Sequence, residues 1–188
     1  MMMKWLYTGI LLMFLSGCAH PPKLAPTEFH LTQRLIAQLP APKSHAPFHS
    51  QALITTAVRG HELSFMAMVT IQDHTLTLIA LTPVGIRVFK TVYDGHTITT
   101  EQYLPNIPLP NMPEILGNFM LAHYDAQAWQ EHLPETVHIH DAGLTRTLIN
   151  DAHQTILTIE YVQNGRQKVP VQIHNEVLNY TLTLKNIQ

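Results

Sequence analysis

The chain contains a single cysteine, Cys18, and its thiol is the strongest nucleophile that the sequence offers. The thiol follows an apolar stretch from Trp5 to Leu15, which is itself preceded by the positive charge of Lys4. That stretch has the length of a secretory h-region and is shorter than the roughly 20 residues that a membrane-spanning helix needs. We therefore expect residues 1–17 to form a signal peptide, with the thiol immediately after it.

The residues Leu15-Ser16-Gly17-Cys18 resemble the bacterial lipobox. The resemblance implies that the Cys18 sulfur receives a diacylglycerol, that the chain is then cut before Cys18, and that the new amine is acylated. Several chains, at about 0.8 kcal/mol per buried methylene, give a stable anchor. Ala19 in place of aspartate implies the outer membrane, with the protein facing the periplasm, and residues 18–27 would form a lipidated, proline-rich tether. The alternative is an ordinary buried cysteine within a signal sequence.

Histidine is the other residue type that invites a chemical role, since the chain has 13 of them. His138 and His140 form a His-x-His pair whose rings share one face of a strand, but a closed zinc site needs a third and a fourth ligand. No serine lies in a Gly-x-Ser-x-Gly turn, and Glu62 and Glu160 have no evident partner carboxylate. We therefore predict a protein that is not an enzyme, with no catalytic residue, no metal and no cofactor.

Composition narrows the possible partners further. Only 13% of the residues are charged, against roughly 25% in an average soluble domain, and the formal net charge is −2. This balance argues against nucleic acid as a partner. A chain so poor in charge either buries much of its surface or handles apolar material. The length after the signal peptide suits one domain, which we place at residues 28–188.

The elements that must position any site follow from hydrophobic periodicity. Thr27 as N-cap and the apolar residues up to Leu39 predict a helix over 27–39. A period of two then predicts about five strands over 48–104, and a helix is expected over 113–122 with a further turn or two over 125–132. Strands are expected over 137–140, 145–149, 155–163, 167–174 and 177–184, with Asn164-Gly165 as the strongest hairpin turn. The predicted fold class is α+β: a curved antiparallel sheet that forms a half-open β-barrel, with an N-terminal helix and a helical lid insert.

Strand alternation gives each predicted strand one apolar face, and these faces are too extensive for two short helices to cover. Either the sheet packs solid or it keeps an apolar cavity, as small lipocalin-size barrels do. From strand parity the candidate cavity residues are Phe65, Ala67, Val69, Leu76, Leu78, Ile159, Tyr161, Val171, Tyr180 and Leu182, and the candidate lid residues are Ile115, Leu116, Phe119 and Met120. Met66 and Met68 either line such a space or cover the outer face. A shift of a strand's register by one residue would turn its candidate side chains to the opposite face of the sheet.

The chain as a whole resembles the LolA/LolB group of lipoprotein carriers and outer-membrane receptors. The segments that carry the resemblance are Leu15 to Cys18, "TEFHLTQRLIAQL", "LTPVGIRVFKTVYDG", "PEILGNFMLAHYDAQAWQEHLPE" and the terminal "LTIEYVQNGRQKVPVQIHNEVLNYTLTLKNIQ". Their order is closest to that of the LolB-like lipoproteins of unknown function that accompany aryl polyene biosynthesis genes. The resemblance implies a lid-covered barrel whose apolar interior receives acyl chains.

The partners expected from this resemblance are an acylated ligand or lipoprotein and the outer membrane, with the protein itself a monomer. The function would be lipoprotein or aryl polyene lipid transfer or localisation. The alternative is a structural or assembly lipoprotein that binds an envelope protein and has no ligand cavity. The sequence departs from LolB in one respect, because the loops "VRGH", "IQDH" and "YDGH" are polar where LolB has a membrane-entering leucine.

Overall fold

The computed structural model describes residues 24–43, 47–58 and 61–187. Cys18, the predicted signal peptide and the first part of the tether lie outside these residues. A short hairpin of β1 (Glu28–His30) and β2 (Ile36–Gln38) comes first. It is followed by five strands, a helical segment and five more strands. These are β3 (Phe48–Val58), β4 (His61–Gln72), β5 (Thr75–Leu81), β6 (Arg87–Tyr93), β7 (Ile98–Gln102), helix α2 (Met112–His123), the 3-10 turn η2 (Ala126–Trp129), β8 (Val137–Ala142), β9 (Thr145–Asn150), β10 (Thr155–Asn164), β11 (Gln167–Asn175) and β12 (Tyr180–Asn186).

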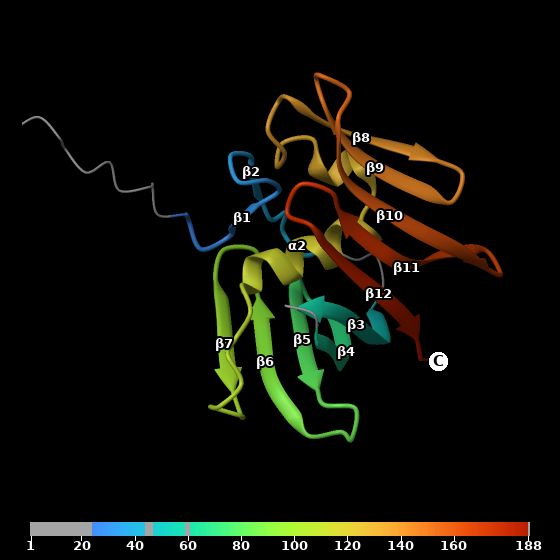
Figure 1. Ribbon diagram of the computed structural model, residues 1–188. Coiled ribbons are helices and arrows are strands. Elements are labelled where there is room, and N and C mark those ends of the chain that lie inside the picture. The colour runs from blue at the N-terminus through green and yellow to red at the C-terminus, as the bar shows by residue number, and fades with distance from the viewer. Residues whose placement is uncertain (1–23, 44–46, 59–60, 188) are drawn as a thin grey trace, which may run out of the picture.

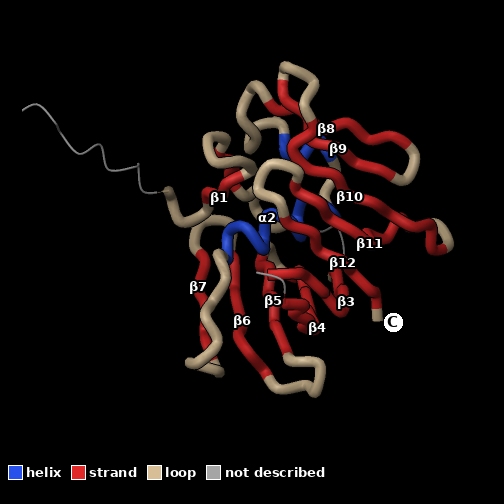
Figure 2. Tube along the Cα trace, in the orientation of Figure 1, coloured by secondary structure: helices blue, strands red, loops and turns tan. Residues whose placement is uncertain are grey.

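The ten strands from β3 to β12 form one antiparallel sheet. Figure 2 colours the strands red. Its order is β7-β6-β5-β4-β3-β12-β11-β10-β9-β8, so two consecutive meanders join where the first strand pairs with the last. At that joint Leu184 of β12 lies opposite Ile54 of β3. The sequence thus correctly predicted the antiparallel hairpins, including the β10–β11 hairpin at Asn164-Gly165, where Asn164 pairs with Gln167.

The predicted fold class is wrong. The described chain is mainly β, and its sheet is open, because the edge strands β7 and β8 do not pair with each other. The segment that joins these two edges carries α2, which lies between the two halves of the sheet in Figure 1. Leu116, Met120 and Leu121 of that helix are fully buried. They belong to the hydrophobic core that the helix shares with the sheet.

The predicted N-terminal helix is also wrong, since residues 27–39 form the β1–β2 hairpin. Phe29, Leu31, Ala37 and Leu39 are all buried, and their spacing on each arm is two, which suits strands. Thr32 stabilises the turn between β1 and β2, because its hydroxyl accepts hydrogen bonds from the backbone N–H groups of Arg34 and Leu35. Apolar residues at these positions match a helical pattern as well as a strand pattern. The threonine turn decides between the two.

Helix α2 is fixed to the hairpin by a close contact at one glycine. A Cβ atom placed on Gly117 would lie 2.6 Å from the ring of Phe29 in β1. Phe29 in turn meets the fully buried Trp129 of η2 edge to face, with ring centroids 6.1 Å apart. The hairpin, α2 and η2 therefore pack as one unit against the concave side of the sheet.

Candidate ligand cavity

A cavity of about 330 Å³ lies between α2 and the concave face of the sheet, and its walls are predominantly apolar. Strands from both meanders contribute to it, so it spans the β3–β12 joint. Its lining residues are Ile54, Thr56, Phe65, Ala67, Val69, Leu78, Pro110, Asn111, Glu114, Ile115, Asn118, Phe119, Ala122, His123, Ile173, Tyr180, Leu182 and Leu184. We call this space the inner cavity.

One small side chain, that of Ala67, lies on the floor of the inner cavity. Register places Ala52 of β3 opposite Ala67 of β4, and Ala67 opposite Ala80 of β5. Ala67 lines the inner cavity, and with Ala52 it also lines a narrow adjoining space of about 30 Å³. A well-packed interior would fill such a gap with larger side chains. The short side chain of Ala67 leaves room beneath the helix.

The structure brings together six of the ten residues predicted from strand parity to line a cavity. Phe65, Ala67, Val69, Leu78, Tyr180 and Leu182 surround the inner cavity. The other four lie elsewhere: Leu76 and Ile159 are fully buried in the core, Val171 is half-buried, and the Tyr161 hydroxyl donates to the Ala122 carbonyl at 3.0 Å. A register shift between Glu160 and Tyr161 pairs Tyr161 with Pro170 rather than Val171. That bulge breaks the simple parity on which the prediction relied.

The four predicted lid residues divide into two pairs on different faces of α2. Ile115 and Phe119 line the inner cavity, whereas Leu116 and Met120 point into the fully buried core. This follows from helical geometry, in which residues four apart share a face. Neither Met66 nor Met68 lines the inner cavity. Met68 is exposed, and the Met66 sulfur accepts a hydrogen bond from the Gln51 side chain.

Sequence reasoning missed the polar residues at the two ends of the inner cavity. At the N-terminal end of α2, Glu114 lines the wall, and burial raises the pKa of its carboxyl group. Nearby, the Tyr180 hydroxyl donates to Asn118 Oδ1 at 3.0 Å, and burial raises the pKa of this tyrosine to about 12. The spacing of Glu114 and Asn118 could have indicated this, because residues four apart lie on one side of a helix, here close to the face of Ile115 and Phe119.

At the other end of α2, His123 closes the inner cavity. Its ring lies 4.5 Å from that of Phe119 and 5.4 Å from that of Phe48, measured between centroids. Removal from water disfavours the charged imidazolium and lowers the His123 pKa to about 4. The side chain is therefore neutral at neutral pH and serves as an apolar wall.

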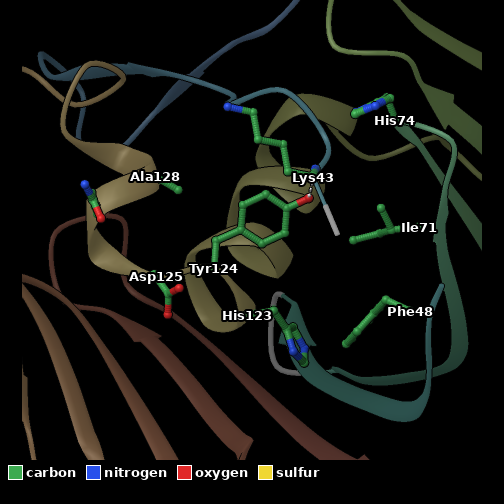
Figure 3. Close-up of a pocket in the computed structure, with 9 residues that line it drawn as sticks. Lys43, Phe48, Ile71, His74, His123, Tyr124, Asp125 and Ala128 are labelled. Atoms are coloured by element: carbon green, nitrogen blue, oxygen red, sulfur yellow. Dashed lines mark hydrogen bonds between the residues drawn. The ribbon is translucent and has the colours of Figure 1, made fainter. Parts of the chain in front are cut away.

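Beyond His123 lies a larger and more polar space of about 710 Å³, which we call the outer cleft. Figure 3 shows Tyr124 and Asp125 on one side of it and Phe48, Ile71 and His74 on the other, with Lys43 above. The backbone N–H of Lys43 donates to the Tyr124 hydroxyl at 3.2 Å. His123 lines both the outer cleft and the inner cavity, so the aromatic group of Phe48, Phe119 and His123 separates a polar space from an apolar one.

Arg146 of β9 holds the C-terminal end of α2, and with it His123, in place. Its Nη1 donates to the carbonyl groups of Leu121 and Tyr124, each at 2.6 Å. Its Nε and Nη2 form a bidentate pair with Asp141 at 2.7 and 2.8 Å, which lowers the Asp141 pKa. A cation at the C-terminal end of a helix also interacts favourably with the helix dipole. The buried guanidinium thus connects α2 to the sheet.

The histidine pair lies on the edge strand β8, away from both spaces. His138 and His140 are exposed, and His138 Nε2 lies 2.8 Å from Asp151 Oδ1. Over residues 24–43, 47–58 and 61–187, no group of three or more His, Cys, Asp or Glu side chains is placed to hold a metal ion. The same ranges include no helix with the length and apolar character that crossing a membrane demands.

Fold and site together define a mainly β protein that encloses an apolar cavity between a curved open sheet and a helix. The chain belongs to the family described as protein of unknown function (DUF3261), whose model matches residues 49–188. A comparison with curated proteins finds no match. Among solved structures, the chain is similar to the crystal structure of the LolA superfamily protein NE2245 from Nitrosomonas europaea. The TM-score is 0.42 and the identity 10%, over 79% of this chain and 87% of that one.

Proposed function

We propose that the protein is a non-enzymatic outer-membrane lipoprotein that shelters an acyl chain in the inner cavity. Cys18 would carry the lipid anchor, and the cargo would be a lipoprotein or an aryl polyene lipid that is transferred or localised in the periplasm. The observation that carries the proposal is the apolar space of about 330 Å³ beneath α2.

The physical argument is one of transfer between apolar surroundings. A hydrocarbon chain that leaves a bilayer exposes surface to water at a cost of about 25 cal/mol per Å². Walls such as Phe65, Val69 and Leu182 offset that cost without covalent chemistry. An anchored protein also stays beside the membrane from which the chain comes, so release requires only a small difference in affinity.

The test uses the full chain with Cys18→Ser, which removes the expected site of lipidation and allows purification without detergent. We expect organic extraction of this protein to yield acyl or polyene molecules, identified by mass spectrometry. In the same background, Ala67→Phe fills the cavity floor and should reduce the amount of recovered material. The matched control is a phenylalanine at an exposed position. Ala142→Phe, an equal change at an exposed position of β8, leaves it unchanged.

Extraction that yields no hydrocarbon, together with failure of a fluorescent fatty acid to bind, would contradict the carrier function. An envelope protein that co-purifies with such an empty domain would favour the structural or assembly role instead.

A further inference from the structure

We propose that the Glu114 end of the inner cavity is a binding site for an amide group, so that the preferred ligand is an acyl chain joined to the rest of its molecule through a secondary amide. The Asn118 side chain would donate a hydrogen bond to the amide carbonyl, and the Glu114 carboxylate would accept one from the amide N–H. This inference rests on the proposed function and deepens it, because it names the chemical group next to the sheltered chain.

The inner cavity reaches the surface of the protein at this end. Pro110 and Asn111, which come just before α2, line the cavity and are exposed to solvent. At the opposite end the rings of Phe48, Phe119 and His123 close the cavity. A chain that enters beside Asn111 therefore places its apolar tail between α2 and the sheet. Its polar end group then lies near the first turn of the helix.

Asn118 supplies a hydrogen-bond donor at this end. Its side chain lines the cavity, although the residue is only 7% exposed. The Oδ1 atom accepts a hydrogen bond from the Tyr180 hydroxyl at 3.0 Å. In the part of the chain that the structure describes, no group accepts a hydrogen bond from Asn118 Nδ2. Because a buried donor without a partner is unfavourable, a ligand carbonyl that pairs with this NH₂ group removes a cost.

Glu114 supplies an acceptor one helical turn before Asn118. Residues four apart lie next to each other on a helix, and both of these line the cavity. Glu114 is half-buried and forms no ion pair within residues 24–43, 47–58 and 61–187. A carboxylate accepts hydrogen bonds and has none to donate. Glu114 therefore favours a ligand group that carries an N–H or O–H, and it disfavours a carboxylate.

A secondary amide fits the donor and the acceptor together. Its N–H and C=O lie in one plane and point in opposite directions in the trans form. Two side chains whose Cβ atoms are about 5 to 6 Å apart can therefore contact one group each. An ester keeps the carbonyl but has no donor, and a hydroxyl offers both side chains only one oxygen atom. A free carboxylate would face Glu114 with a like charge.

The first experiment compares four ligands that share a twelve-carbon chain and differ in the end group. They are N-methyldodecanamide, methyl dodecanoate, dodecanol and dodecanoate, each bound to the full-length Cys18→Ser protein. We expect the dissociation constant of the amide to be about tenfold lower than that of the ester, because the ester loses a hydrogen bond to a charged group. Dodecanoate should bind most weakly. Equal constants for the amide and the ester, or tighter binding of dodecanol than of the amide, would overturn the proposal.

Two substitutions separate the two contacts. Glu114→Met removes the acceptor but keeps a long side chain, so amide binding should weaken about tenfold, to the level of the ester, while ester binding stays the same. Asn118→Asp keeps an acceptor for the Tyr180 hydroxyl but removes the NH₂ group, so it should weaken the amide and the ester alike. The matched control is Glu131→Met, the same exchange at an exposed position, which should leave all four constants unchanged.

The ratio of amide to ester affinity is measured within each variant, so a general loosening of α2 does not imitate the expected result. A ratio that Glu114→Met leaves unchanged would overturn the assignment of the acceptor. Binding of the ester in preference to the amide would refute the amide site but leave the carrier function standing. Failure of all four ligands to bind would refute both.

Discussion

Gly117 is the residue where helix packing is most sensitive to a small change. Alanine normally favours a helix over glycine by about 1 kcal/mol. Here the added methyl group would overlap the ring of Phe29, which is itself held by Trp129. We expect Gly117→Ala to lower the free energy of unfolding by about 1 to 3 kcal/mol, measured by urea denaturation. In a double-mutant cycle, Phe29→Leu should relieve part of this loss, and strictly additive effects would show that the two residues do not interact.

His123 should make the stability of the protein depend on pH. Its pKa is lowered from 6.5 to about 4 in the folded state, so the unfolded chain binds a proton first as the pH falls. The stabilisation is therefore complete above pH 6.5 and decreases by about 3 kcal/mol as the pH falls to 4. The difference between wild type and His123→Leu, followed by urea denaturation from pH 4 to pH 7.5, isolates this residue from the other titrating groups. A difference that is constant over that range would contradict the buried, neutral imidazole.

At the scale of elements, Arg146 should determine how firmly α2 is held against the sheet. Arg146→Lys keeps the charge but loses the bidentate pair with Asp141 and one or both contacts to the helix carbonyl groups. We expect a loss of about 2 to 3 kcal/mol in the free energy of unfolding, together with weaker ligand binding because His123 is no longer fixed. Asp141→Asn is the control, since it retains the helix contacts and should cost less. An equal loss in both variants would locate the effect in the ion pair alone.

The sequence predicted some elements well and others poorly, for identifiable reasons. Helix 113–122 and the four predicted strands between 137 and 174 lie within one or two residues of their observed bounds, whereas the last strand, predicted over 177–184, is observed over Tyr180–Asn186. Residues 27–39 fit two periods, and the local turn at Thr32 decides in favour of the hairpin. The half-open barrel failed because strand patterns carry no information about whether edge strands meet. The bulge at Tyr161 likewise could not be inferred from alternation, and it misplaced Val171.

At the scale of the whole molecule, attachment to the membrane should depend on Cys18, which lies outside the described residues. We expect Cys18→Ser to abolish both the mass added by acyl chains and the cut before residue 18, so that the protein keeps residues 1–17, as mass spectrometry would show. The control is Ser16→Ala, which changes a neighbouring residue but keeps the thiol. An acyl mass that persists on Cys18→Ser, or loss of residues 1–17 from it, would argue against the lipid anchor.

Ligand binding should also stabilise the whole domain, since the inner cavity includes parts of both meanders. A ligand present at one hundred times its dissociation constant adds about 2.7 kcal/mol to the free energy of unfolding. Dodecanoate should therefore raise the melting temperature of the Cys18→Ser protein, and Ala67→Phe should remove most of that increase. An increase that survives the filled cavity would place the binding elsewhere.

The pairing of β3 with β12 has a consequence for how the chain reaches its final form. These two strands are neighbours at the middle of the sheet, yet they are the first and the last of its ten strands to be synthesised. The backbone N–H and C=O groups on one edge of β3 therefore have no strand partner until the final residues of the chain have been made. While the C-terminal hairpin is still being synthesised, the sheet lacks β12 and the edge of β3 that pairs with it stays exposed. Loss of only the last few residues would thus remove the centre of the structure rather than its margin.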